Sequence, residues 1–177
     1  MKKLLRCAAL ALVMALLMAA CSSAPSLGAK DLTELTDKFL KALAAKDYEA
    51  VVNLLPKEVA EYGEKYLEGA REDVVAFAKY AAHDYYWLAE MNLPAHPDYT
   101  YEITEMGSEI PEKAKGGGSV LMEEDGVVLY VQAMGGVALT VDIGEEEPVE
   151  GSLFALQLDD GRWYLISVAG DDEIFIY

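Results

Sequence analysis

Cysteine and histidine are scarce in this chain of 177 residues, which has two of each. Both cysteines, Cys7 and Cys21, lie near the N-terminus, so the chain after position 21 cannot form a disulfide. Without further cysteines, the two histidines cannot complete a Cys/His zinc site. A domain formed by the rest of the chain must therefore be stabilised by its hydrophobic core alone.

Basic residues are also few, 14 against 31 acidic ones, and three of them lie in positions 1–20. Residues 21–177 therefore have 11 basic and 31 acidic side chains, a formal net charge of −20. Such a charge repels nucleic acid and anionic headgroups, so no nucleic acid is expected among the partners. Acidic turns such as 123–125 and 145–147 favour solubility. A weak divalent-cation site is the alternative, although no stretch has the spacing of a calcium loop.

Catalytic signatures are missing as well. No serine lies in a Gly-x-Ser-x-Gly elbow, and Gly116-Gly117-Gly118 lacks the Lys-Ser pair of a phosphate-binding loop. His83 precedes Asp84, but adjacent residues of a helix point about 100° apart and cannot form a dyad with each other. These patterns predict no catalytic residue, no metal site and no cofactor.

The N-terminus has the anatomy of an export signal. Lys2, Lys3 and Arg6 precede fifteen uncharged residues that run from Cys7 to Cys21. As a helix this stretch reaches about 22 Å, short of a hydrocarbon core of roughly 30 Å, which disfavours a permanent membrane span. An ordinary secretory signal and an uncleaved anchor are the alternatives.

The segment Leu17-Met18-Ala19-Ala20-Cys21 resembles the lipobox of bacterial lipoprotein precursors, with Met18 where the family usually has leucine. The resemblance implies that the Cys21 thiol receives a diacylglyceryl group and that cleavage leaves Cys21 as the N-terminus. Because one acyl chain holds a protein only marginally, several chains are needed for a stable anchor. We therefore expect an exported protein, anchored by lipid to the outer face of the bacterial cell membrane or to the outer membrane.

Three segments are expected along the chain: a lipoprotein signal peptide at 1–20, a flexible tether at 21–30 and a single domain at 31–177. The sequence of 22–30, SSAPSLGAK, consists mostly of small and polar residues with one proline, which is typical of a tether. The 157 residues that remain after the signal suffice for one domain with a sizeable core.

The first part of the domain is predicted to be helical. Asp31 is a candidate N-cap, Asp47 can cap a second short helix, and Pro56 can end that helix and begin the next, which continues over 57–92. Apolar residues recur at spacings of three and four along the first helix: Leu32, Leu35, Phe39, Leu40 and Leu43.

After Pro97 the hydrophobic period changes to two, which predicts strands. Asp125-Gly126 and Asp159-Asp160-Gly161 are expected turns, and Gly135-Gly136 is expected to separate two strands. Helices followed by strands predict an α+β domain, with N-terminal helices packed on a curved antiparallel sheet of about four to six strands. The expected strands lie in 99–103, 119–124, 127–134, 137–143, 152–158 and 163–169, and the stretch 173–177 could add a last one that closes the chain.

Two stretches resemble nuclear transport factor 2-like domains. KFLKALAAKDYEAVVNLL (38–55) is similar to the family's opening, in which a helix carrying phenylalanine is followed by a Lys-Asp-Tyr step and a second helix. DDGRWYLISVA (159–169) is similar to its last hairpin, in which a glycine turn precedes a strand with tryptophan. The resemblance implies a cystatin-like α+β cone, a bent antiparallel sheet wrapped round helices with an apolar cavity at its open end.

Aromatic residues are dense in the middle of the chain. A tyrosine has a flat apolar ring and a hydroxyl that needs a partner, so such side chains can line a cavity for a small amphipathic molecule or a peptide. Simple core packing is the alternative for each of them. The candidate ligand-binding residues are Tyr80, His83, Tyr86, Trp87, Tyr99 and Tyr101.

The expected function is that of a cell-envelope lipoprotein whose domain is a non-enzymatic binding module for another envelope protein or a small amphipathic ligand. The alternative is a proton-transfer or hydrolytic enzyme of the nuclear transport factor 2-like type, with His83 as its base. A third hypothesis is a structural or inhibitory partner that presents acidic loops to a secreted enzyme. Only the enzyme requires His83 in an enclosed pocket near a carboxylate from another element.

Overall fold

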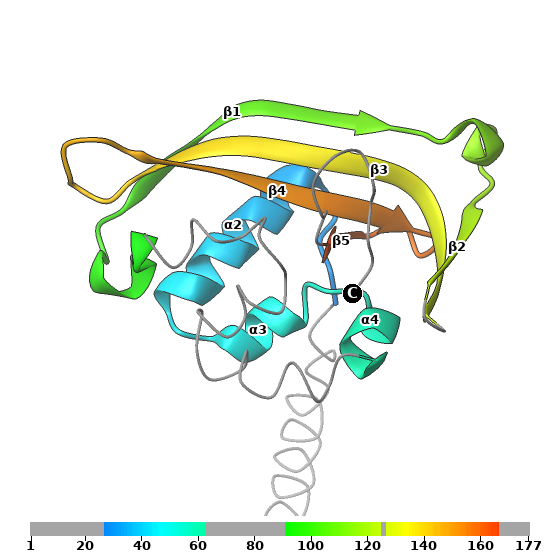
Figure 1. Ribbon diagram of the computed structural model, residues 1–177, viewed down its shortest axis with the longest axis horizontal. Helices are drawn as coiled ribbons and strands as arrows, with labels where there is room; N and C mark the ends of the chain where they lie inside the picture. Colours follow the sequence, from blue (N-terminus) through cyan, green and yellow to red (C-terminus); the bar gives the residue numbers. More distant parts are fainter. Residues whose placement is uncertain (1–26, 63–90, 125–126, 167–177) are drawn as a thin grey trace, which may run out of the picture.

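Short helices lie beneath one antiparallel sheet of five strands (Figure 1). A computed structural model of the protein describes residues 27–62, 91–124 and 127–166. In these ranges the chain has the α+β architecture predicted from the sequence. The helices are α2 (Leu32–Ala44), α3 (Tyr48–Val52) and α4 (Lys57–Tyr62), with 3-10 turns η2 (Leu93–Ala95) and η3 (Glu112–Ala114). The strands are β1 (Thr100–Glu109), β2 (Val120–Glu124), β3 (Val127–Asp142), β4 (Val149–Leu158) and β5 (Trp163–Ile166).

The predicted caps start the first two helices. The Asp31 carboxylate accepts a hydrogen bond from the backbone N–H of Glu34 at 2.7 Å, and Asp47 accepts one from that of Ala50 at 3.1 Å. These bonds satisfy N–H groups that have no partner inside a helix. The apolar stripe of α2 is buried as its spacing predicts, with Phe39 and Leu40 fully covered.

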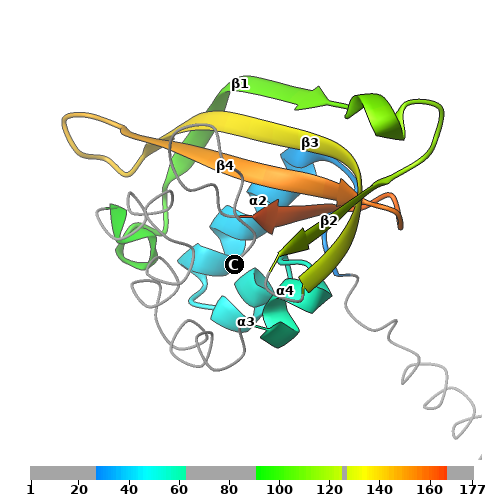
Figure 2. The ribbon, with the colours of Figure 1, turned by 45° about the vertical axis from the view of Figure 1, so that its right-hand side comes forward.

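The sheet has the strand order β1-β3-β4-β5, and β2 pairs with β3 beyond the end of β1. The long strand β3 curves down at the end where β2 joins it (Figure 2). The prediction that Gly135-Gly136 separates two strands is wrong, because both glycines lie inside β3 and pair with β1 and β4. Gly135 is needed there for a close approach, since a Cβ atom would lie 2.8 Å from the ring of Trp163.

The core has two clusters, and β5 separates them. Trp163 and Leu165 belong to the larger cluster, which also contains the buried faces of α2 and α3. Tyr164 and Ile166 belong to the smaller one, with Val59 of α4 and the first half of β3. Because side chains alternate along a strand, both faces of β5 are buried.

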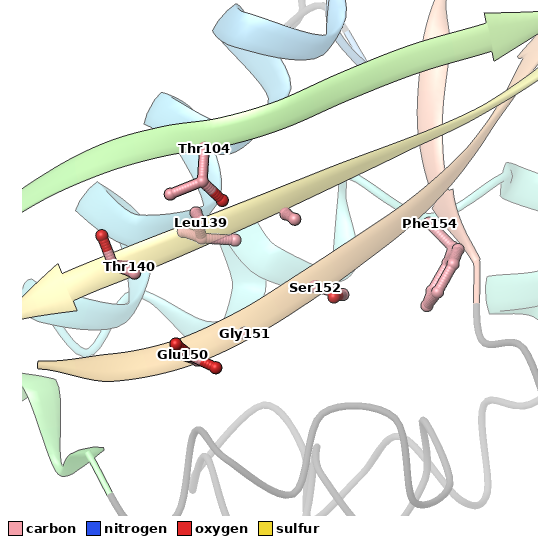
Figure 3. Close-up of a pocket in the computed structure, with 8 residues that line it drawn as sticks. Thr104, Leu139, Thr140, Glu150, Gly151, Ser152 and Phe154 are labelled. Atoms are coloured by element: carbon pink, nitrogen blue, oxygen red, sulfur yellow. The ribbon is translucent and has the colours of Figure 1, made fainter.

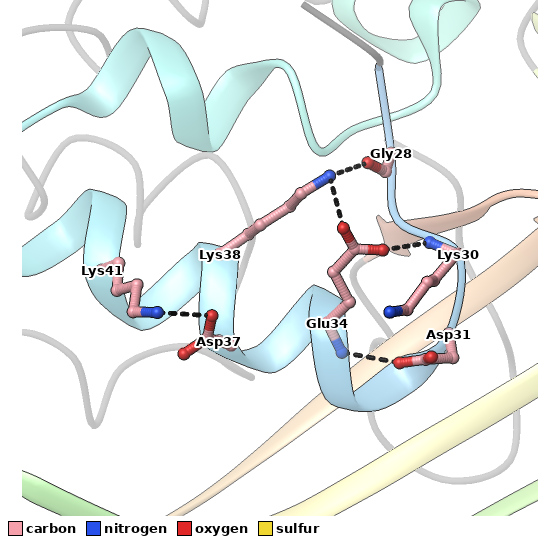
Figure 4. Close-up of polar contacts among 7 residues, drawn as sticks. All are labelled: Gly28, Lys30, Asp31, Glu34, Asp37, Lys38 and Lys41. Carbon is pink, nitrogen blue, oxygen red and sulfur yellow. Dashed lines mark hydrogen bonds and ion pairs between the residues drawn. The ribbon is translucent and has the colours of Figure 1, made fainter.

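Residues 28–30, the end of the expected tether, are bound to the domain. The backbone of Ala29 forms a bridge with Trp163, and the two N–H···O bonds of this bridge are both 2.8 Å long. Lys38 donates to the carbonyl oxygen of Gly28 at 2.9 Å and pairs with Glu34 at 3.4 Å (Figure 4). Glu34 in turn accepts from the backbone N–H of Lys30 at 2.7 Å, so α2 holds the incoming chain.

Other predicted features are placed only in part. The strands on both sides of the Asp125-Gly126 turn pair as expected, with Glu124 opposite Val127. The turn itself, the helical stretch 63–90 and the strand at 173–177 lie outside the described residues. The turn at 159–161 joins β4 to β5, and Gly161 has a φ of +75°, which favours glycine.

Candidate functional site

Only two of the six candidate ligand-binding residues, Tyr99 and Tyr101, lie in the described part of the chain. Both are half-buried at the start of β1 and pack against the larger core cluster. Both tyrosines therefore contribute to core packing, and whether they also bind a ligand stays a prediction. The candidates Tyr80, His83, Tyr86 and Trp87, and the lipidation residue Cys21, lie outside the described residues.

Asp37 of α2 links Tyr101 to a lysine. The hydroxyl of Tyr101 donates to Asp37 Oδ1 at 3.5 Å, and Lys41 Nζ donates to Asp37 Oδ2 at 2.7 Å. Burial raises the pKa of Tyr101 and of Tyr99, and the negative charge of Asp37 raises both further. The hydrogen bond to Asp37 raises the pKa of Lys41. At neutral pH the two phenols are therefore protonated, and the Tyr101 hydroxyl acts as a donor.

A pocket of about 360 Å³ lies beside Tyr99, where β1 begins and β3 ends. His96 lies between η2 and β1 and lines this pocket. Two carboxylates, Asp98 and Asp142, share the lining, and Asp142 accepts a hydrogen bond from the backbone N–H of Gly144 at 2.8 Å. The pocket combines the Tyr99 ring and the His96 imidazole with acidic groups, whereas Tyr101 is not part of its described lining.

A larger groove of about 600 Å³ lies on the outer face of the sheet, the face turned away from α2 (Figure 3). Figure 3 shows side chains from three strands along it, with Thr104 on β1, Thr140 on β3, and Glu150 and Phe154 on β4. On β3, Val137, Leu139 and Val141 are buried in the larger core cluster beneath it. The groove is lined by Thr104, Ala138, Leu139, Thr140, Glu150, Gly151, Ser152 and Phe154.

The described lining of this groove contains none of the ligand-binding residues predicted from the sequence. Its only local signal is the alternation of small or hydroxyl residues with buried aliphatic ones, such as Ala138 and Thr140 between Val137, Leu139 and Val141. That alternation identifies a solvent-facing side of a strand, but it does not show which other strands lie next to it.

No described group of three His, Cys, Asp or Glu side chains is arranged to hold a metal ion. Within 27–62, 91–124 and 127–166, no helix has the length and hydropathy that a membrane span requires. Comparisons of the chain with protein-family models, with curated proteins and with solved structures gave no match.

Proposed function

We propose that this protein is a cell-envelope lipoprotein whose domain is a non-enzymatic binding module for another envelope protein or a small amphipathic ligand. The observation that carries the binding role is the groove of about 600 Å³ on the outer face of the sheet. It combines hydroxyl groups, a carboxylate and an aromatic ring in an open concave surface, a mixture typical of recognition sites.

The proposal includes a nuclear transport factor 2-like fold for residues 31–177. Two local features support it, and each coincides with a motif quoted above. The step at Asp47 joins α2 to α3, and Trp163 begins the last described strand after a turn that contains Gly161. A bent antiparallel sheet over helices is the arrangement that this family resemblance implies.

The proposed location at the cell envelope depends on Cys21, with residues 1–20 as a signal peptide that is removed. Acyl chains on Cys21 would hold the protein on the outer face of the cell membrane or at the outer membrane. The test is expression of the full chain in bacteria fed radioactive palmitate, followed by mass spectrometry of the mature N-terminus. We expect label on the parent chain and on Cys7→Ala, and none on Cys21→Ala. An unmodified Cys21 thiol in the mature protein would contradict the proposed anchor.

The binding role is tested by site-specific photo-crosslinking in intact cells. A photoreactive amino acid at Thr140 lies in the groove, whereas the same group at Glu123 lies on the exposed side of β2. We expect discrete crosslinked products from position 140 that are absent from position 123. Identical products from both positions, or none from either, would count against a binding role for the groove.

A further inference from the structure

Cross-strand pairs define the rows of the groove. Thr140 lies opposite Glu150 and Gly136 lies opposite Phe154. Because directly opposed residues point to the same face, these side chains form one continuous surface. Glu150 and Phe154 lie four residue steps apart on β4, so the surface is about 13 Å long, enough for several residues of an extended chain.

The polar groups of this surface have no side-chain partner among the described residues. The hydroxyls of Thr104, Thr140 and Ser152 and the carboxylate of Glu150 form no hydrogen bond or ion pair with another described residue. A polar group without a protein partner can bind a ligand without first breaking an internal bond. The groove therefore offers hydroxyl and carboxylate acceptors, and the described part of its lining contains no lysine or arginine.

The described charged side chains on the same face as the groove are acidic. On β1, Glu102 lies opposite Thr140 and Glu105 lies opposite Ala138, so both point to the same face as Glu150. All three side chains are exposed. A surface of this charge attracts cations and repels anions.

Phe154 closes the other end of the groove. Its ring lies against the backbone of Gly136, where a Cβ atom would lie 3.7 Å from ring atom Cδ1. The residue packs against the smaller core cluster, but it is only half-buried and also lines the groove, so part of its side chain is available to an occupant. Arginine and lysine side chains bind favourably to the faces of aromatic rings.

We propose that the groove binds a basic, extended segment of a partner protein, with lysine or arginine side chains paired to Glu150 and Glu102 and placed on Phe154. The hydroxyls of Thr104, Thr140 and Ser152 accept hydrogen bonds from the same segment. This inference rests on the proposed binding function and names the chemistry of the partner. A basic segment fits better than a neutral glycan because the exposed carboxylates around the groove share one charge.

The test measures the fluorescence anisotropy of a labelled Lys-Ser repeat peptide with the full chain in non-ionic detergent micelles. Glu150→Gln should weaken binding about three-fold, the effect of losing one exposed ion pair. Phe154→Leu keeps an apolar side chain but removes the aromatic face, and should weaken binding at least about two-fold. A Glu-Ser repeat peptide should not bind.

The matched control is Glu123→Gln, which removes the same charge at an exposed position of β2. Glu123 pairs with Val128 of β3. Val128 lies ten residues along β3 from Ala138, which lines the groove, and ten residues correspond to about 33 Å of strand. This variant should bind the peptide as the parent does. Equal weakening by Glu123→Gln and Glu150→Gln would overturn the inference, because general attraction to an acidic protein would then explain the binding.

A neutral cello-oligosaccharide serves as the competing probe. If it binds and Glu150→Gln weakens it, while the Lys-Ser peptide does not bind, the occupant is a glycan and the inference is overturned. Absence of lipid on Cys21 would refute the proposed location at the cell envelope, but it would leave the peptide binding measured in micelles unchanged. The two failures are therefore distinguishable.

Discussion

Gly135 and Gly136 are adjacent in β3 and point to opposite faces, so they form a matched pair of mutation sites. A Cβ atom at Gly135 would lie 2.8 Å from Trp163 Cζ3 and 3.0 Å from Leu32 Cδ1. Favourable carbon contacts need about 3.5–4.0 Å, and both neighbours are buried. At Gly136 the nearest atom, the backbone oxygen of Leu153, is 3.7 Å away, an ordinary contact.

Gly135→Ala should therefore overpack the core and lower the free energy of unfolding by about 1–3 kcal/mol. The smaller conformational freedom of alanine in the unfolded chain offsets about 0.4–1 kcal/mol of this loss. A net loss of about 1–2 kcal/mol corresponds to a fall in melting temperature of about 3–6 °C for a domain of this size. Gly136→Ala has only the entropic gain and should be neutral or slightly stabilising.

The assay is thermal unfolding of the full chain in non-ionic detergent, followed by circular dichroism and tryptophan fluorescence. The two variants differ by one position and carry the same added methyl group, so the difference between their melting temperatures reports the local packing. Equal melting temperatures, or a larger loss in Gly136→Ala, would refute the placement of Gly135 against Trp163.

Three further substitutions test other contacts. Gly28→Ala places a Cβ atom 2.8 Å from the Trp163 carbonyl oxygen at a φ of +70°, so faster hydrogen exchange of the Trp163 amide is expected; unchanged exchange would argue against the bridge. Asp31→Ala should lower the free energy of unfolding by about 1 kcal/mol and Asp31→Asn by less, measured in urea; equal losses would exclude a cap. Burial and the bond to Asp160 raise the pKa of Tyr164. Because the unfolded chain loses this proton first, above about pH 10, stability should fall with rising pH by up to about 1.4 kcal/mol per unit. Tyr164→Phe should flatten that slope in alkaline urea titrations, and an unchanged slope would contradict the assignment.

Helices α2 and α3 were predictable because their signals are local. Asp31 and Asp47 each cap the N–H of the residue three positions ahead, a distance that the sequence fixes. The place of Gly135-Gly136 inside a strand was not predictable, because its cause is not local. Gly135-Gly136 has the composition of a loop, but the requirement for glycine comes from Trp163 and Leu32, which are distant in sequence.

The candidate site was less predictable than the helices. The aromatic rings of Tyr99 and Tyr101 are equivalent signals in the sequence, but Tyr99 lines a pocket whereas Tyr101 packs toward Asp37 of α2. The groove combines three strands whose pairing the sequence does not specify. On β1 the register shifts between Ile103 and Glu105. Such an irregularity changes which side chains face outward after it, and alternation alone does not predict it.

The contacts of residues 28–30 limit how far the domain can stand from a bilayer. In the proposed lipoprotein, seven residue steps separate the acylated Cys21 from Gly28, and a fully extended chain of that length spans at most about 25 Å. The helix α2 holds Gly28 and Lys30 in place, so the linker cannot lengthen while these bonds persist. In that proposed arrangement a binding partner would have to come close to the same lipid surface, and one fixed on the far side of a wide periplasm would be out of range.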